Sequence, residues 1–458
     1  MFPLELLLPA VMFVTMAIML FSGYPVAFVL GGVGLAFGLV GYAFDVLQLR
    51  QYFNLVPRVF GGVVANQVLV AVPMFIFMGT VFEKSGVADD LLRCLQVLLR
   101  RIPGGLAMAV TLMGTIMAAT TGIVGASVVM LTLIALPTMI EARYNKPLAT
   151  GTIAAAGTLG VLIPPSIMLV VMGDLLQVPV GTLFMAAILP GLLLSGLYLV
   201  YIGVVTSLKP SLAPPLAKEI GPQGGAELMT MIVRSFLPPA FLIFMVLGSI
   251  YLGWATPTEA SGVGCLGALL LAAWKRRLDR KTVHTILHTS TLTNAMVFLI
   301  FLGATTFSYV FRAVGGDDLM TYVFNQLGLG PWGILIFLMV LVFLLGFFFE
   351  WIEITLIVLP VFVPILQKVS FGEHLAAPTD FVPWFAILCA VNLQTSFLTP
   401  PFGFTLFYMK GTVPPSVTMG DIYRGIIPFV ILQLTGLMLC IFFPGIAMWL
   451  PRQLGALE

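Results

Sequence analysis

Long runs of apolar residues, separated by short polar segments, extend from one end of the chain to the other. Runs of about 20 apolar residues are long enough to cross a bilayer as helices, and these runs do not alternate with polar residues as barrel strands do. Because lipid leaves backbone groups without water, we predict an all-α polytopic membrane protein. The candidate spans are 4–21, 24–44, 66–83, 147–177, 183–207, 228–251, 257–274, 284–311, 380–409 and 424–448.

Two further apolar stretches, 104–140 and 331–367, are too long for one span and are interrupted near the middle. The interruptions are Thr120–Ser127, which is rich in threonine and glycine, and Glu350–Glu353. Each half has about 16 residues, fewer than the ~20 that a crossing helix needs. We therefore predict two re-entrant hairpins. The alternative is two ordinary spans joined by a tight external turn, which the two glutamates would also suit.

A short phrase occurs twice in the second arms of these stretches. Thr132–Pro137 reads TLIALP and Thr355–Pro360 reads TLIVLP. Each copy is followed by a double proline inside an apolar helical pattern, Pro164-Pro165 and then Pro400-Pro401. Proline removes a backbone donor and breaks a helix, and paired broken helices in corresponding positions indicate a transport site between two repeats. We predict an inverted repeat in one membrane domain.

The distribution of basic residues supports opposite orientations for the two hairpins. If the first opens to the cytoplasm and the second to the outside, 16 of the 21 Lys and Arg residues lie inside, as the positive-inside rule requires. Both termini then lie outside. The five on the outer side are Arg50, Arg58, Arg312, Lys368 and Arg452.

This topology divides the chain into two halves and a linker. The first repeat is 1–208, with scaffold helices 1–101, transport hairpin and broken helix 102–180, and span 181–208. The linker is 209–227, in the cytoplasm. The second repeat is 228–458, with scaffold helices 228–327, transport hairpin and broken helix 328–412, and final span 413–458.

Oxygen-bearing residues gather at the hairpin tips and at the helix breaks. Freed carbonyls at mid-membrane need partners, and hydroxyl, amide and carbonyl oxygens are hard ligands that suit Na⁺. We predict one Na⁺ site per repeat; back-bonding of each hydroxyl to its own helix is the alternative. The predicted ligands are Thr120, Thr121, Gly122, Ser127, Gly157, Thr158 and Pro164 in the first site, and Glu350, Glu353, Thr355, Asn392, Thr395 and Thr399 in the second.

A substrate site is expected between the two tips, where half-helix N-termini favour an anionic group such as a carboxylate. Arg312 could approach it from one end, so recognition should rest mainly on backbone amides and hydroxyls. Glu350 and Glu353 either bind a cation, relay protons or orient a helix, or they are solvated near an aqueous face. The predicted substrate residues are Ser166, Gly125, Pro165, Ser396 and Pro400.

Composition narrows the function classes. Hydrophobic residues are 60% of the chain and charged residues 9%, and the net charge of +2 does not favour nucleic acid. The four cysteines are scattered and form no metal or disulfide framework. The nucleotide-binding Gly-x-x-x-x-Gly-Lys-Ser/Thr motif, the His-Glu-x-x-His motif and a nucleophile elbow are all absent. We expect no enzyme activity and no cofactor, with Na⁺ as coupling ion only.

Several segments together resemble the large membrane subunit of TRAP transporters, the DctM type. They are Val124–Pro137, Ala154–Gly160, Ile163–Ser166 and Asn392–Gly403, flanked by Pro103–Ala107 and Glu141–Pro147. The resemblance runs over nearly the whole chain, and the twelve residues Asn392–Gly403 are the most specific part.

This resemblance implies properties that the residues alone do not. It implies an elevator mechanism driven by Na⁺ rather than ATP, a separate small four-helix membrane subunit, and a periplasmic binding protein that delivers an organic acid. The location implied is the bacterial inner membrane. The first hairpin tip, Thr121–Ser127, is more apolar than the Ser-Gly-Ser-Ala form of many members, which leaves the substrate open. The rival hypotheses are a stand-alone dicarboxylate or citrate carrier and a channel or receptor-like subunit.

Overall fold

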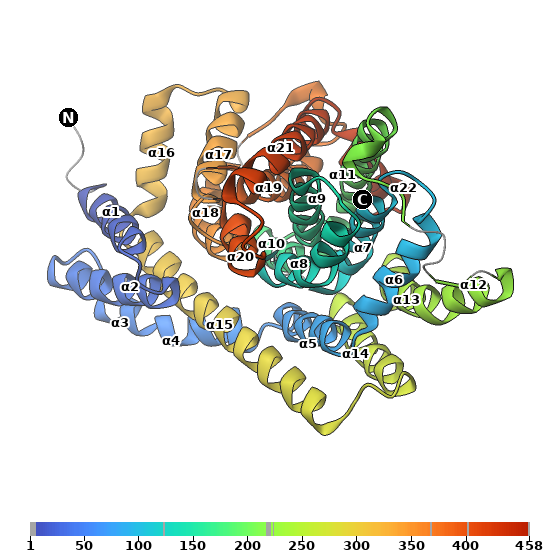
Figure 1. The fold of residues 1–458 in the computed structure, drawn as a ribbon. Coiled ribbons are helices and arrows are strands. Elements are labelled where there is room, and N and C mark those ends of the chain that lie inside the picture. The colour runs from blue at the N-terminus through green and yellow to red at the C-terminus, as the bar shows by residue number, and fades with distance from the viewer. Residues whose placement is uncertain are drawn as a thin grey trace.

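The computed structural model describes residues 6–121, 124–216, 221–222, 224–366, 369–400 and 403–456, and all the regular secondary structure within these ranges is helical (Figure 1). Within these ranges the side chains of 118–121, 364, 365 and 404 are not described. Seven of the described helices are long and apolar enough to cross a membrane, or up to nine if two bent pairs each form one span. The prediction of an all-α polytopic protein is confirmed.

The first half of the chain runs to α11 and includes the first hairpin and the first broken helix. Its helices are α1 Leu7–Phe21, α2 Val26–Ala43, α3 Leu49–Phe53, α4 Leu55–Val59, η2 Phe60–Val64, η3 Val68–Val70, α5 Ala71–Lys84, α6 Val87–Leu99, α7 Gly105–Thr121, α8 Val124–Glu141, α9 Lys146–Thr158, η4 Leu159–Val161, α10 Ile167–Leu176 and α11 Val180–Leu208.

The second half begins after the short helix η5 Pro210–Leu212. Its helices are α12 Gly225–Met231, η6 Ile232–Phe236, α13 Leu237–Tyr251, α14 Pro257–Trp274, α15 Arg280–Ala313, α16 Gly316–Leu327, α17 Pro331–Leu345, α18 Trp351–Leu366, η7 Gly372–His374, η8 Pro378–Asp380, α19 Phe381–Leu398, α20 Phe404–Thr412, α21 Met419–Phe442 and α22 Gly445–Gln453.

The structure differs from the predicted spans at two places. The segment Leu49–Val64, which we did not predict as helical, forms α3, α4 and η2 and meets the following helix Val68–Lys84 at a bend of 53°. The last predicted span, 424–448, is also wrong as one helix, because α21 ends at Phe442 and a turn before Gly445 redirects the chain into α22. The second error falls at Pro444, which precedes α22 and lacks the backbone donor that would continue α21.

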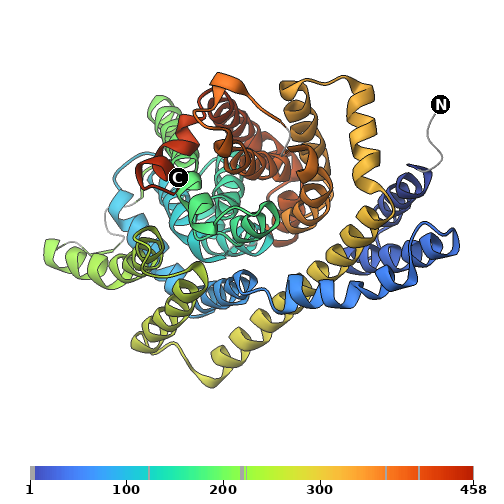
Figure 2. The same ribbon diagram turned by 180° about the vertical axis from the view of Figure 1, so that it is seen from behind.

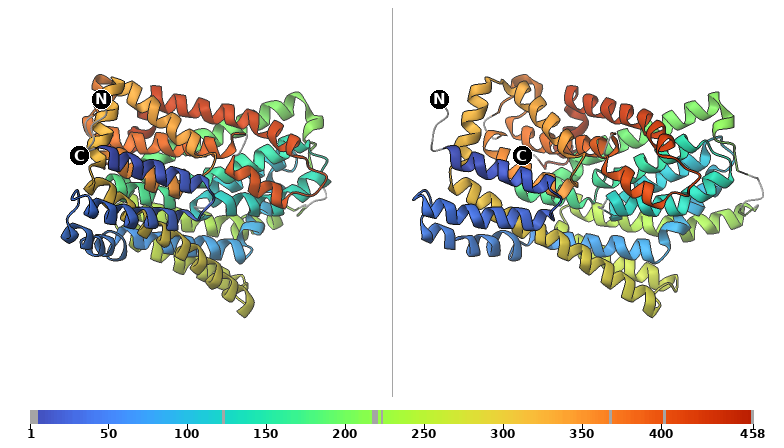
Figure 3. Two further views of the ribbon diagram at one scale, coloured as in Figure 1. Left: turned by 90° about the vertical axis from the view of Figure 1, so that its left-hand side faces the viewer. Right: turned by 60° about the vertical axis from the view of Figure 1, so that its left-hand side comes forward.

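The helices form two groups that lie against each other. A peripheral layer, α1–α5 with α13–α15, runs along the lower edge of Figure 1, and a core bundle, α7–α11 with α17–α22, fills the centre. The 34-residue helix α15 extends along the peripheral layer and packs on α2 and α5 (Figure 2). Most helices of both groups run in nearly the same direction (Figure 3). Contacts between the groups run mainly from α5 to α7 and α10, and from α15 to α18.

The core bundle is closely packed around α9, in which every residue from Leu148 to Thr158 is buried. Its crossing with α21 uses two glycines: a Cβ added to Gly151 would lie 2.0 Å from the carbonyl oxygen of Gly425. Small residues at such crossings allow backbones to approach and gain van der Waals contact, which is the main attraction between helices in lipid.

The interruption predicted in the second long apolar stretch is a helix break, because α17 ends at Leu345 and α18 begins at Trp351. In the first stretch α7 ends at Thr121 and α8 begins at Val124, and residues 122–123 of the predicted interruption lie outside the described residues. The arms of the second hairpin, at 15 and 16 residues, are shorter than a crossing helix needs. In the first hairpin α8 has 18 residues, enough by length to cross. Re-entry from opposite faces and the inverted repeat stay predictions.

Candidate functional site

Breaks in two core helices contain Pro164 and Pro165 in the first case and Pro400 in the second, while Pro401 lies outside the described residues. After α9 and the single 3-10 turn η4, the chain is not helical again until Ile167, and the Pro164–Pro165 peptide bond within this segment is cis. The second break follows Leu398, where Thr399 is extended, and α20 begins at Phe404. Unwound backbone of this kind leaves carbonyl oxygens without helical partners.

Each hairpin packs against both broken helices. The arm α8 contacts α9 of its own half and α20 of the other half, while α18 contacts α10, and α17 contacts α19. The second arm of each hairpin therefore packs on the C-terminal segment of the broken helix in the other half of the chain. That is, α8 packs on α20, and α18 packs on α10. This exchange brings the two breaks and the two hairpins into one bundle.

A small cavity lies between the first hairpin and the first break. It has a volume of about 10 Å³, and Ser127, Gly157 and Gly160 are among the residues that line it. That volume holds one particle of the size of a water molecule. Of the ligands predicted for the first site, the structure thus brings Ser127 and Gly157 together.

The remaining residues predicted for the first site lie elsewhere or are not described. Thr158 is buried, donates to the Ala155 carbonyl at 2.9 Å and accepts from Gln433 at 3.4 Å, so its hydroxyl is directed toward α21. Pro164 is buried in the break but does not line the cavity. Gly122 lies outside the described residues, as do the side chains of Thr120 and Thr121.

The residues predicted for the second site make mostly local bonds. Thr395 and Thr399 donate to carbonyls one turn back in their own helix, each at 2.9 Å. Asn392 instead joins two elements, because its Nδ2 donates to the Met339 carbonyl of α17 at 2.6 Å. Thr355 is buried, and its hydroxyl has no hydrogen-bond partner among the described residues.

The two predicted glutamates mark the tip of the second hairpin. A carboxylate oxygen of Glu353 accepts from the backbone amide of Glu350 at 3.1 Å, which caps the start of α18. Tyr408 of α20 is close enough to both carboxyl groups to interact electrostatically with them. Its ring also contacts Gly125 of the first hairpin, where an added Cβ would lie 2.9 Å away. Tyr408, which the sequence analysis missed, therefore joins the two tips.

The predicted substrate residues do not surround one large cavity. Ser166 is buried and donates to the Val161 carbonyl at 2.5 Å, and Pro165 is buried beside it. Ser396 donates to the Leu393 carbonyl at 2.8 Å, and its hydroxyl is packed against Gly346 of the second hairpin. Pro400 is half-buried.

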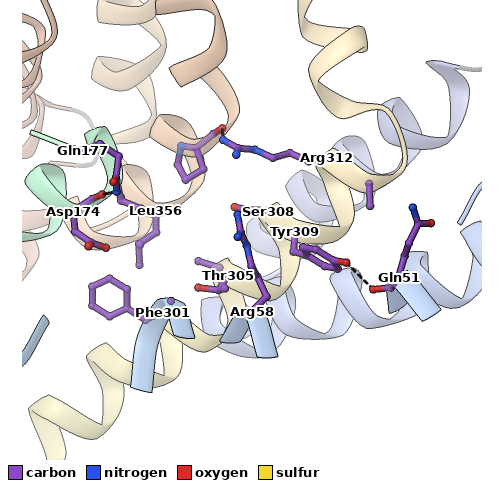
Figure 4. Close-up of a pocket in the computed structure, with 15 residues that line it drawn as sticks. Gln51, Arg58, Asp174, Gln177, Phe301, Thr305, Ser308, Tyr309, Arg312 and Leu356 are labelled. Carbon is purple, nitrogen blue, oxygen red and sulfur yellow. Dashed lines mark hydrogen bonds between the residues drawn. The ribbon is translucent and has the colours of Figure 1, made fainter. Parts of the chain in front are cut away.

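A large cavity lies between the peripheral layer and the core bundle. Its volume is about 560 Å³. Its walls come from α3, α4 and η2, from α15, and from α10 and α18 (Figure 4). None of the predicted substrate residues lines it, whereas Arg58, Arg312 and Asp174 do. Of these three, sequence reasoning had placed only Arg312 near the substrate, because the residues are scattered along the chain.

Comparisons with known proteins agree with the arrangement of helices. Residues 13–446 match the family model described as "Tripartite ATP-independent periplasmic transporter, DctM component". The C4-dicarboxylate TRAP transporter large permease protein DctM of Pseudomonas aeruginosa is 30% identical over 84% of this chain and 87% of its own length. The isethionate TRAP transporter permease protein DctMQ of Oleidesulfovibrio alaskensis is 29% identical over 93% of this chain and 65% of its own.

A solved structure has a similar fold. The YdaH transporter of Alcanivorax borkumensis superposes with a TM-score of 0.59, covering 90% of this chain and 90% of its own, at 16% identity. At that identity the likeness concerns the fold alone.

Proposed function

The chain belongs to the family of the DctM component of tripartite ATP-independent periplasmic transporters, and on that premise we propose that it imports a small organic acid in symport with Na⁺. Members of this family are large permease subunits of transporters rather than enzymes. The proposal adds three properties to this membership: Na⁺ as the driving ion, delivery of the solute by a periplasmic binding protein, and elevator movement of the core bundle.

The exchanged packing of the hairpin arms is the observation that carries the proposal. It puts two proline-broken helices, each next to a hairpin, into one bundle. In secondary transporters, broken helices at a repeat interface supply the backbone groups that hold the solute and the coupling ion. A solute bound between the tips would contact both repeats at once.

Oxygen donors next to the breaks support Na⁺ as the coupling ion. The cavity at Ser127, Gly157 and Gly160 has room for one water-sized ion. At the other hairpin, the buried hydroxyl of Thr355 has no partner among the described residues and is a candidate ligand. These are hard, uncharged ligands, which suit Na⁺ better than a transition metal.

The two-group architecture supports elevator movement. The core bundle contains both hairpins and both broken helices, and the peripheral layer contains the long helix α15. In this proposal the peripheral layer stays fixed in the membrane and the core bundle slides past it as a rigid body. The contacts of α5 and α15 with the bundle would then change during transport.

The class of solute and the partners follow from the family. The names of the two relatives above refer to C4-dicarboxylates and isethionate, which are both small organic anions. We infer the same class for this chain, together with a separate small four-helix membrane subunit and a periplasmic binding protein. The inner membrane, with both termini in the periplasm, is the location that accompanies this proposal.

Uptake in proteoliposomes tests the proposal. The chain is purified with its small subunit and reconstituted, and a solute found by a thermal-shift screen of the binding protein is supplied in labelled form. Accumulation that needs both an inward Na⁺ gradient and the binding protein is the expected result. Accumulation without the binding protein would favour a stand-alone carrier, and equilibration without accumulation would favour a channel.

A further inference from the structure

The large cavity is more basic than the predicted substrate region. Two guanidinium groups line it, those of Arg58 on α4 and Arg312 on α15, against one carboxylate, that of Asp174. Asp174 already accepts a hydrogen bond from Asn66 at 2.7 Å. Figure 4 shows Arg58 and Arg312 on the peripheral side of the cavity, with Asp174 on the opposite side.

Most of the donor capacity of these arginines remains available. Arg312 donates from Nη2 to the Pro360 carbonyl at 2.8 Å, and its Nε lies 3.8 Å from Oδ1 of Asp317. Arg58 donates its backbone N–H to the Asn54 carbonyl at 3.1 Å, whereas its side chain has no hydrogen bond or ion pair among the described residues. A guanidinium has five N–H donors, so both groups can still donate hydrogen bonds to the oxygens of a planar anion.

Hydroxyl groups lie beside the two arginines. Thr305 and Ser308 also line the cavity from α15, and Ser308 is one helical turn before Arg312. Tyr309 is already engaged, since its hydroxyl donates to the Gln51 carbonyl at 2.7 Å. The lining therefore combines two cations with two small hydroxyl groups on one wall.

We propose that this cavity is an entry site for small organic anions, in which Arg58 and Arg312 bind the oxyanion group of a carboxylate or sulfonate. The inference rests on the proposed function, because it adds a first binding position before the site between the hairpins. Arginine suits this role, since its fork of donors matches the two oxygens of a carboxylate.

The size and position of the cavity fit an entry site. Its volume of about 560 Å³ falls within the ~300–1,000 Å³ typical of small-molecule sites. It lies where the peripheral layer meets the core bundle, so a bound anion would contact both. The excess of positive over negative charge in the lining also raises the local concentration of anions, and such focusing in clefts amounts to about 10-fold or more.

Charge-dependent labelling tests the proposal without knowledge of the solute. Ser308→Cys introduces a half-buried thiol one turn from Arg312, while the four native cysteines are all buried. Membranes containing this variant, with both faces accessible, are treated with a negatively charged sulfonatoethyl or a positively charged trimethylammonioethyl methanethiosulfonate. The labelling rate with the anionic reagent is divided by the labelling rate with the cationic reagent. This ratio, divided by the same ratio for a free thiol in solution, measures the preference of the cavity for anions.

We expect the anionic reagent to be favoured by about tenfold or more. Arg58→Gln and Arg312→Gln should each lower the ratio several-fold, whereas Arg58→Lys keeps most of it because the charge remains. Arg50→Gln is the matched control, an exposed arginine on the neighbouring helix α3 that does not line the cavity. Succinate, used as a probe dicarboxylate, should slow labelling.

The outcomes separate this inference from the proposed function. A ratio near one, or a ratio that neither glutamine substitution changes, overturns the entry site even if Na⁺-driven uptake is intact. A charge-dependent ratio in a chain that shows no Na⁺-driven uptake supports the anion site and counts against the proposed function instead. Size-exclusion profiles identify any variant that does not fold, and the other of the two glutamine variants then carries the comparison.

Discussion

Hydroxyl groups at the second break donate hydrogen bonds to carbonyls of their own helix. These hydrogen bonds do not prevent the hydroxyl oxygens from binding an ion. Thr399 donates its single proton to the Thr395 carbonyl at 2.9 Å. The hydroxyl oxygen keeps two lone pairs, so it can still accept a cation. Back-bonding and ion binding are therefore compatible, and the bond fixes the orientation of the hydroxyl.

Replacing Thr399 tests its predicted role in Na⁺ binding. Thr399→Ala removes the oxygen, and we expect the Na⁺ concentration for half-maximal uptake to rise about fivefold, which corresponds to the loss of about 1 kcal/mol. Thr399→Ser keeps the hydroxyl and should restore the wild-type value. If the alanine variant shows unchanged Na⁺ dependence in proteoliposomes, Thr399 is not a ligand.

A charged pair at the end of the core bundle gives a prediction on stability. Asp380, 1% exposed, pairs with Arg452 of α22, which is 35% exposed. Arg452→Ala leaves a buried carboxylate without its cation, and we expect a loss of about 2 kcal/mol, less than for a fully buried pair because water already reaches Arg452. The measurement is the melting temperature in detergent.

Two further variants control this measurement. Adding Asp380→Asn to Arg452→Ala should recover part of the lost stability, because the unpaired charge is gone. Arg280→Ala changes an exposed arginine for which the structure gives no ion pair, and should leave the melting temperature unchanged. Equal destabilisation by both single variants would argue against a specific role for the pair.

At the scale of elements, the core bundle is held together by close helix crossings. Where α9 meets α21, the backbones approach so closely that an added Cβ on Gly425 would lie 2.1 Å from the Pro147 carbonyl oxygen. Such a contact cannot be relieved by turning a side chain, because the atom it meets belongs to the backbone. The crossing therefore needs glycine at this position.

Two glycines on the same helix make a matched test of that crossing. Gly425→Ala should destabilise the protein by about 1–3 kcal/mol through overpacking. Gly420→Ala meets nothing closer than 3.6 Å and should be neutral or stabilising by up to about 1 kcal/mol, because alanine favours the helix. Thermal unfolding in detergent compares the two, and similar effects of both substitutions would contradict the close crossing.

At the scale of the whole molecule, two polar contacts join the peripheral layer to the core bundle around the large cavity. Asn66 bonds to Asp174 of α10, and Arg312 bonds to the carbonyl of Pro360 in α18. An elevator movement would have to break both contacts. They are therefore suitable places to test whether the two groups move relative to each other.

A cross-link between the groups should stop transport if the bundle moves. In Asn66→Cys/Asp174→Cys, whose wild-type side chains are 2.7 Å apart, oxidation should abolish uptake and a reductant should restore it. The control Thr115→Cys/Ser195→Cys joins α7 to α11 inside the core bundle, at the same 2.7 Å, and should not block uptake. Full activity of the oxidised first pair would exclude the proposed movement.

The exchange of hairpin arms was not predictable from the repeated phrase. The two copies of the phrase showed that α8 and α18 are equivalent. They did not show that α8 packs on α20 and α18 on α10, because those partners are more than 100 residues away along the chain. The contact of Tyr408 with Gly125 was missed for the same reason.

The sequence by itself determined the class of the protein and the positions of the helix breaks at its double prolines. These features depend on local properties: the length of apolar runs, and prolines that remove backbone donors. Only the tertiary structure decided which arms pair, that Thr158 is directed toward Gln433, and that Arg58 and Arg312 share a cavity with Asp174. Such contacts join residues far apart in the chain, and they form only when the helices have packed.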